Sequence, residues 1–279
     1  MKRLKLFTFL FAILLLASCG GNTETDNETA SNDQTTPKEI DPKSAKAKFA
    51  SLSAKEIGPE KTEIQQAVED IHVRIAKSDN LYVGYWVGKF GKNMINIILS
   101  DVKNGVASGY SVCAGNYRAL KGSAKKKGGN AYSFVLNEPG DHKYDGKFEF
   151  TIDLNDENLK GTWTPFEGKN VKSYTLNKRD FSYNVKNGDY AYASERVIGE
   201  EELIEYSEEE LRIIRSEIYA RHGYSFTEKD MRYYFEGKDW YMPMSTDVRE
   251  QFTAIEEENI GLLYEYEAYY EDYYNDFGR

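Results

Sequence analysis

The sequence predicts an α+β protein of two domains, in which an antiparallel β meander of about eight strands closes into a barrel and a small module of three helices follows. Three observations lead to this prediction. Apolar residues recur with a period of two within residues 81–182 and with a helical period within residues 183–279. Turn-forming strings such as "KNG", "KKGGN" and "EPGD" separate the alternating runs. The chain has 279 residues, which is enough for more than one compact unit.

The charge of the chain argues against nucleic acid as a partner. The formal net charge is -10, and phosphate backbones need a concentrated basic surface that is not evident in this sequence. Acidic residues gather towards the C-terminus in "GEEELIEYSEEE" and "IEEEN", whereas "GSAKKKGGN" gives the middle of the chain a basic loop. The two halves of the chain therefore differ in electrostatic sign.

Residues 1–18 have the pattern of a secretion signal. Three basic residues within the first five positions precede an apolar segment, which is too short and wrongly flanked for a membrane-spanning helix. The string "LASC" ending at Cys19 resembles the lipobox of bacterial lipoproteins, which implies that Cys19 is acylated and anchors the chain to a membrane. Gly20 in place of an aspartate implies sorting to the outer membrane of the cell envelope. The alternative is an ordinary signal peptide with a chance cysteine.

Two segments precede the strands. Residues 19–58 are poor in core-forming side chains and read as a flexible tether. Residues 59–80 contain one amphipathic helix, whose apolar residues recur at helical spacing: Ile64, Ala67, Val68, Ile71 and Ile75. His72 lies beside this stripe and is interpreted as an ordinary helix residue.

Residues 81–182 carry the strand pattern. In "KFEFTIDL" the apolar residues alternate with polar ones, and "MINIILS", "NAYSFVL" and "NLKGTWTPF" are similar runs. A sequential meander of this length is best closed into a barrel, because closure removes the exposed strand edges. A sandwich of two sheets is the alternative.

Two strands carry a Gly-x-Trp element, which places Trp86 and Trp163 in the predicted barrel. The first of these elements weakly resembles the Gly-x-Trp of the first strand in lipocalins. That resemblance implies a barrel that holds one small ligand or is filled by its own side chains. The abundance of Tyr, Phe and Trp favours a filled or nearly filled interior.

No metal, cofactor or disulfide is predicted. If Cys19 is acylated, Cys113 is the remaining cysteine, and a small apolar side chain inside a strand is favoured over a reactive thiol. Asp141, His142 and Asp145 are close together in "EPGDHKYDG", but a solvated hairpin turn explains them better than a metal site.

A capping box opens the first helix of residues 183–279. Ser207 and Glu210 form the box, and Gly223 suits the left-handed position that ends a helix. Arg221 lies in the last turn, where positive charge interacts favourably with the helix dipole. Arg215 and His222 lean towards the apolar stripe of the helix: Leu211, Ile214, Ile218.

A partly buried guanidinium needs a carboxylate. The predicted candidates are Asp230, Asp239, Glu256 and Glu258. Met231, Tyr234 and Phe235 belong to a second, short helix that Thr227 and Asp230 can cap and that ends near Gly237, and a third helix starts near Thr253.

The strings "IRSEIYARHGYSF", "YF", "DWY" and "IEEENI" resemble the YARHG domain, which is named after the string at 219–223. The resemblance covers roughly the last 70 residues. It implies an extracellular domain of bacterial lipoproteins and other envelope proteins, and it implies no mechanism. Together with the strand region, the domain looks like a lipoprotein of Bacteroidetes-type bacteria.

We therefore expect a non-enzymatic, membrane-anchored envelope lipoprotein that binds or scaffolds a periplasmic or surface partner, either cell wall glycan or a protein. The candidate residues of the binding or structural network are Arg215, Tyr219, Arg221, His222, Tyr224, Phe226, Asp239, Trp240 and Tyr241. Their aromatic rings could stack on a partner around Arg221 or simply fill a small helical core. The alternatives are an envelope hydrolase with His222 as general base, and an inhibitor-type or small-ligand-binding barrel.

Overall fold

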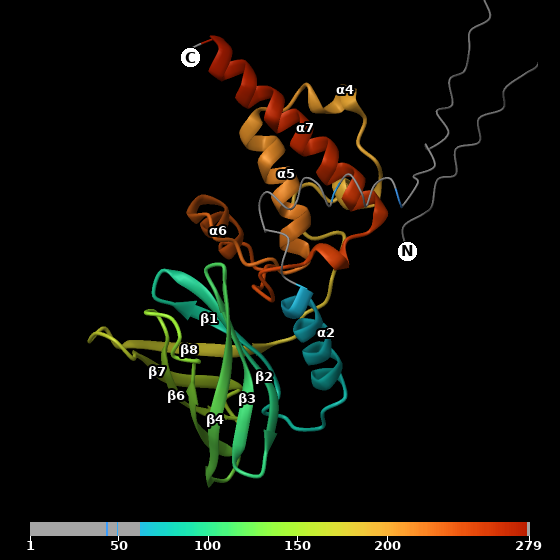
Figure 1. Ribbon diagram of the computed structural model, residues 1–279. Coiled ribbons are helices and arrows are strands. Elements are labelled where there is room, and N and C mark those ends of the chain that lie inside the picture. The colour runs from blue at the N-terminus through green and yellow to red at the C-terminus, as the bar shows by residue number, and fades with distance from the viewer. Residues whose placement is uncertain (1–42, 44–48, 50–61, 278–279) are drawn as a thin grey trace, which may run out of the picture. The chain divides into compact units, whose positions relative to one another are not determined.

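The computed structural model describes Lys43, Phe49 and residues 62–277 of the chain (Figure 1). The predicted signal sequence, Cys19 and, apart from Lys43 and Phe49, the predicted tether lie outside the described residues. A closed antiparallel barrel is followed by a helical C-terminal region, which confirms the predicted fold class. None of the helices among the described residues is both long enough and apolar enough to cross a membrane.

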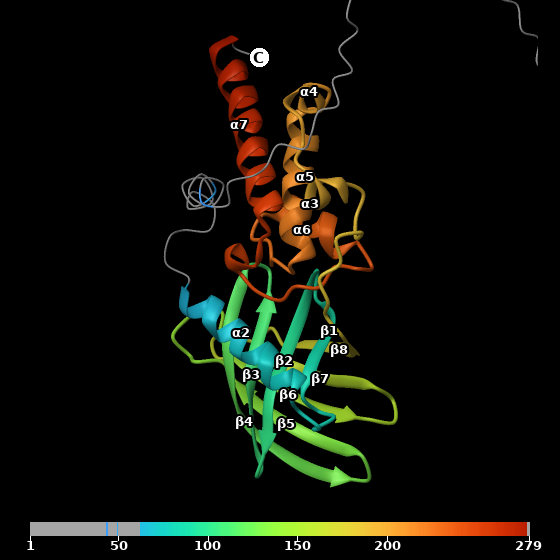
Figure 2. The same ribbon diagram turned by 90° about the vertical axis from the view of Figure 1, so that its right-hand side faces the viewer.

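The barrel consists of eight strands in sequential order, each antiparallel to its neighbours, and β1 closes on β8. Their bounds are β1 (Gly84–Phe90), β2 (Asn93–Lys103), β3 (Val106–Cys113), β4 (Asn116–Gly128), β5 (Ala131–Asn137), β6 (Gly146–Asp153), β7 (Asn158–Pro165) and β8 (Lys172–Arg179). All the connections are hairpins, so the chain forms the barrel and not the alternative sandwich (Figures 1 and 2).

The inward side chains fill most of the barrel interior. The alternation in β6 places Phe148, Phe150 and Ile152 in the core, as the period of two predicts. Phe150 stacks on Phe134 of the neighbouring strand with ring centroids 4.9 Å apart. Trp86 is also buried, and its indole N–H donates to the carbonyl of Tyr82 at 3.1 Å. The cluster further includes Phe90, Ile95, Ile97, Leu99, Leu120, Leu136, Leu159, Trp163, Tyr174 and Leu176.

Helix α2 (Thr62–Ala76) lies along the outside of the barrel beside β2 and β3 (Figure 2). Its Ile71 is buried in a cluster with Tyr85 and Ile98, whose side chains leave the outer face of the barrel. His72 lies in this helix, as predicted, and its Nδ1 lies 2.5 Å from the hydroxyl of Tyr85. Burial lowers the pKa of His72.

The C-terminal region contains α3 (Tyr192–Glu195), α4 (Glu200–Leu203), α5 (Glu208–Arg221), α6 (Lys229–Glu236), the 3-10 helix η1 (Arg249–Gln251) and α7 (Ala254–Phe277). The three helices that the sequence predicts correspond to α5, α6 and α7, and the short helices were not anticipated. Helices α5 and α7 run side by side in both views and pack on each other (Figures 1 and 2).

The predicted ends of α5 are observed. Ser207 and Glu210 form the capping box, with the backbone N–H of Ser207 donating to Glu210 at 2.8 Å. Gly223 follows the helix with a φ of +77°, a conformation that favours glycine. The prediction for α6 was wrong at its start, because Glu228 occupies the N-cap position and makes no side-chain cap there.

Barrel and helical region share polar contacts. The side-chain amide of Asn96 in β2 donates to the carbonyl of Pro243 at 2.9 Å. The backbone N–H of Gly115, in the turn after β3, donates to the hydroxyl of Ser225 at 3.0 Å. A Cβ on Gly115 would lie 2.2 Å from Cγ2 of Thr227, so this close approach requires glycine.

Candidate functional site

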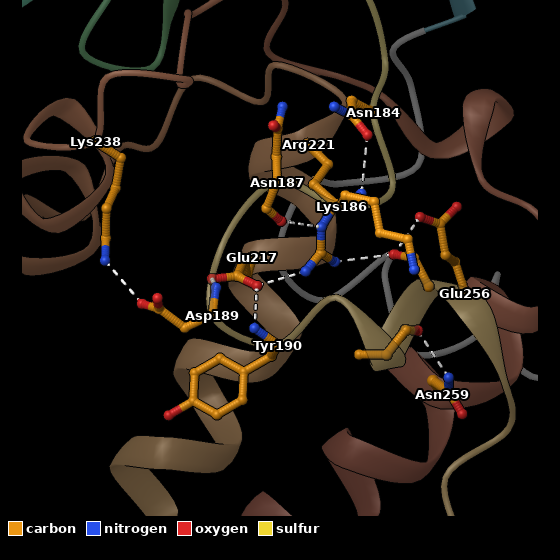
Figure 3. Close-up of polar contacts among 12 residues, drawn as sticks. Asn184, Lys186, Asn187, Asp189, Tyr190, Glu217, Arg221, Lys238, Glu256 and Asn259 are labelled. Atoms are coloured by element: carbon orange, nitrogen blue, oxygen red, sulfur yellow. Dashed lines mark hydrogen bonds and ion pairs between the residues drawn. The ribbon is translucent and has the colours of Figure 1, made fainter. Parts of the chain in front are cut away.

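The guanidinium of Arg221 is buried, with 1% of the residue exposed. Its Nε donates to the carbonyl of Asn187 at 2.7 Å, its Nη1 donates to the hydroxyl of Ser194 at 2.9 Å, and its Nη2 pairs with Glu217 one helical turn earlier (Figure 3). The sequence predicts only a favourable interaction of Arg221 with the helix dipole. That interpretation was incomplete, because all three nitrogens are used in holding elements of the helical region together.

Glu217 is the carboxylate partner of Arg221 and also fixes the segment before α3. Its two oxygens accept the backbone N–H groups of Asp189 and Tyr190 at 2.9 and 2.7 Å. Gly188 in this segment has a φ of +93°, and a Cβ there would lie 2.2 Å from Cδ of Glu217. The segment can therefore close over the ion pair only because Gly188 has no side chain.

His222 belongs to a second buried pair. Its Nε2 lies 3.0 Å from a carboxylate oxygen of Glu256, and its ring stacks on Tyr183 with centroids 4.5 Å apart. Glu256 also accepts hydrogen bonds from Ser194 and from the backbone N–H of Thr253. Burial by itself would raise the pKa of Glu256, but the hydrogen bond and charge of His222, together with these donors, hold the pKa below its ordinary value. Glu256 was one of the four predicted carboxylates.

Arg215 is buried against α7. Its guanidinium makes two hydrogen bonds to Glu267, at 2.7 and 2.9 Å, and lies 4.0 Å above the ring of Tyr264. Glu267 was not among the predicted carboxylates, so the predicted partners of Arg215 were wrong. The expectation that Arg215 is buried and paired agrees with the structure.

The candidate aromatic residues serve as core in the described structure. Tyr219, Tyr224, Phe226 and Tyr241 are buried in one cluster, and the hydroxyl of Tyr241 donates to the carbonyl of Tyr224 at 2.7 Å. Trp240 is half-buried at the edge of this cluster. The exposed Asp239 uses its carbonyl, which accepts from Arg179 at 2.8 Å. These rings fit the alternative of a small helical core better than that of a stacking surface.

A pocket of about 280 Å³ opens at one end of the barrel. This end gathers the turns at residues 91–92 and 114–115 and the loops at residues 138–145 and 166–171. The pocket is lined by Phe90, Asn93, Ile95, Ser111, Cys113, Ala114, Asn116, Arg118, Glu138, His142, Tyr144, Asp145, Phe148, Trp163 and Lys172. Open barrel ends with an apolar wall and a few polar groups are typical ligand sites.

The aromatic wall of this pocket carries a cation. Phe90 and Trp163 meet edge to face with centroids 5.8 Å apart. The ammonium of Lys172 lies 4.5 Å from the centroid of Phe90 and 5.1 Å from that of Trp163. Both distances are within the range of cation–π attraction.

Two acidic residues, Glu138 and Asp145, also line the pocket. Glu138 is 8% exposed and accepts hydrogen bonds from Ser111, from the indole of Trp163 and from the backbone N–H of Gly146. Burial raises the pKa of Glu138, and these donors oppose the rise. Asp145 is also buried and pairs with Arg118, whose Nε donates to it at 3.0 Å.

Asp141 pairs with Arg118 as well, so the predicted cluster of Asp141, His142 and Asp145 is organised by an arginine. The interpretation as a solvated hairpin holds for Asp141 and His142, which are exposed, but it was wrong for the buried Asp145. In the described part of the chain, no three His, Cys, Asp or Glu side chains are arranged to hold a metal ion.

Arg118, Glu138 and Lys172 were not among the predicted site residues. A signal was present for two of them, because Arg118 alternates in phase with the buried Leu120 of its strand, and Lys172 with the buried Tyr174 and Leu176 of its strand. Glu138 lies in the loop after β5, where no such pattern applies. Cys113 also lines the pocket. Burial raises the pKa of its thiol to about 12, so the side chain is a neutral thiol at physiological pH.

The fold and the site define a class of protein: a closed eight-stranded β barrel with a polar and aromatic pocket at one end, joined to a helical domain. Residues 188–268 of that helical part match the family model of the YARHG domain. The predicted resemblance is thereby confirmed for this part of the chain. Neither a curated protein nor a solved structure shows significant similarity to the chain.

Proposed function

We propose that the protein is a non-enzymatic lipoprotein of the bacterial cell envelope that binds its partner at the open end of the barrel, with the YARHG domain as scaffold. In this proposal Cys19 carries the lipid and attaches the chain to the outer membrane of a Bacteroidetes-type cell. The partner is cell wall glycan or an envelope protein. The observation that carries the proposal is the pocket, where aromatic rings and charged groups converge from several hairpins.

The use of polar groups inside the helical region supports a scaffolding role for it. Arg215, Arg221 and His222 each pair with a buried or nearly buried carboxylate within that region. Groups engaged in this way hold neighbouring elements together and are poorly placed to meet a partner. By contrast, Tyr144 at the barrel pocket is 68% exposed.

A hydrolase that uses His222 as general base is the second candidate. His222 and Glu256 form a histidine–carboxylate pair, and in hydrolases such a pair orients the catalytic histidine. A general base must reach its substrate directly or through one water molecule. His222 is 4% exposed and lies against the rings of Tyr183 and Phe252, which supports a structural role instead. An ester or amide hydrolysis that His222→Gln abolishes without lowering the melting temperature would favour the hydrolase.

Retention on isolated cell wall tests the location of binding. We expect the full chain to be retained and Tyr144→Ser to weaken retention. Tyr269→Ser is the matched control, because Tyr269 is a similarly exposed tyrosine on α7. Equal retention of the two variants would contradict binding at the barrel end. If the wild-type chain is not retained, an envelope protein is the proposed partner, and crosslinking from position 144 would identify it.

A further inference from the structure

The barrel pocket contains a cation without an acidic partner. Of the two strongly basic residues in its lining, Arg118 pairs with Asp141 and Asp145. Lys172 makes no ion pair with any residue that the structure describes. Its ammonium lies over the rings of Phe90 and Trp163, and its side chain is exposed to solvent, where an ammonium can donate hydrogen bonds to a ligand.

The acidic groups of the pocket are already engaged. One oxygen of Asp145 accepts from Arg118, and the other accepts from Arg118 and from the backbone N–H of Gly140. Glu138 accepts three hydrogen bonds from the wall of the pocket. The pocket therefore offers an available positive charge, whereas its negative charges are used within the protein.

The size and shape of the pocket restrict which anionic ligands can bind in it. The volume of about 280 Å³ is just below the roughly 300 to 1,000 Å³ of pockets that hold drug-sized molecules. If the anionic group of a ligand binds Lys172, the rest of the ligand would lie at the wall formed by Phe90, Phe148 and Trp163. Such a wall packs well against the apolar face of a single ring.

We propose that this pocket binds a carboxylate attached to a single ring, with Lys172 pairing with the carboxylate and the aromatic wall packing against the ring. The inference rests on the proposed binding function of the barrel end. The same chemistry has two sources, an acidic sugar of a glycan or an aromatic acid. Lys172 gives the site its preference for the anion, and Arg118 stays in its ion pairs with Asp141 and Asp145.

Titration calorimetry with the full chain tests the carboxylate. N-acetylmuramic acid and N-acetylglucosamine form a matched pair of probes, because the first carries a lactyl carboxylate on the ring of the second. We expect the acidic sugar to bind at least about tenfold more tightly, as for one charge-assisted hydrogen bond. Lys172→Gln should remove this preference. Lys169→Gln, which changes an exposed lysine in the loop before β8, should leave it unchanged.

The other probes separate the sources and define failure. Benzoate binding more tightly than the acidic sugar would identify an aromatic acid, with the same dependence on Lys172. Equal binding of the two sugars, no binding of either acid, or tighter binding of benzylamine that increases in Lys172→Gln would overturn the inference. If retention on cell wall still depends on Tyr144 while the acids do not bind, this inference fails alone. If the wild-type chain is retained but its retention does not depend on Tyr144, the proposed function fails.

Discussion

Replacing Arg221 by methionine tests the view that the arginine of the YARHG string is an internal clamp. Methionine keeps much of the side-chain volume but removes the charge and all three hydrogen bonds to Asn187, Ser194 and Glu217. Glu217 is fully buried and would lose its cationic partner. Removing one partner of a buried ion pair costs about 3 to 5 kcal/mol, which is a large part of the roughly 5 to 15 kcal/mol by which a domain is stable.

The free energy of unfolding, measured by urea titration with far-UV circular dichroism, gives the cost. Arg212→Met is the matched control, because Arg212 lies on the same helix, is 29% exposed in its side chain and pairs with Glu228 and Asp230 at the surface. Exposed ion pairs contribute about 0 to 1 kcal/mol. The double variant Arg221→Met with Glu217→Gln should recover part of the loss, since it removes the buried carboxylate that has lost its partner. A cost for Arg221→Met no larger than that for Arg212→Met would refute the reasoning.

Three further predictions concern other groups. Gly188→Ala should lower the melting temperature more than Gly168→Ala, because both glycines have positive φ but only the first would place a Cβ against Glu217. Because the pKa of Glu256 is lowered in the folded state, this group stabilises the fold at pH values above 4.5, its ordinary pKa. The contribution is lost as the pH falls through the lower pKa of the folded state. Melting at a series of acidic pH values should show this loss in the wild type and a weaker dependence in Glu256→Gln. Iodoacetamide should label Cys113 slowly at pH 8 in the folded protein and quickly in urea, because burial raises the thiol pKa to about 12; fast labelling of the folded protein would contradict that burial.

The sequence predicts best where a local rule and the tertiary environment agree. Alternation in β6 reports directly which side chains enter the barrel, because a strand has two faces and one of them is covered. The capping box at Ser207 and the turn at Gly223 depend only on residues a few positions away. Closure of the barrel follows from the sequential meander, since eight paired strands otherwise leave two edges open.

The sequence predicts poorly where the partner is distant and lies in irregular backbone. Arg221 is buried by the segment around Asn187, which has neither a helical nor a strand period, so no pattern showed that it would cover the helix end. Glu267 pairs with Arg215 because α7 continues for several turns beyond Glu258, the last of the predicted carboxylates. For the pocket residues that lie in strands, the alternation along each strand indicates which side chains point inward. Which of them meet in one pocket depends on the register of the closed barrel.

The segment ahead of α3 sets a limit on where the helical part can be cut from the rest of the chain. Tyr183 stacks on His222, and Asn187 and Asp189 bind the Arg221 and Glu217 pair. The family match begins at residue 188, downstream of two of these contacts. A fragment designed on that boundary would lack them and would leave a charged group partly uncovered, whereas a fragment that starts before Tyr183 carries its own covering segment.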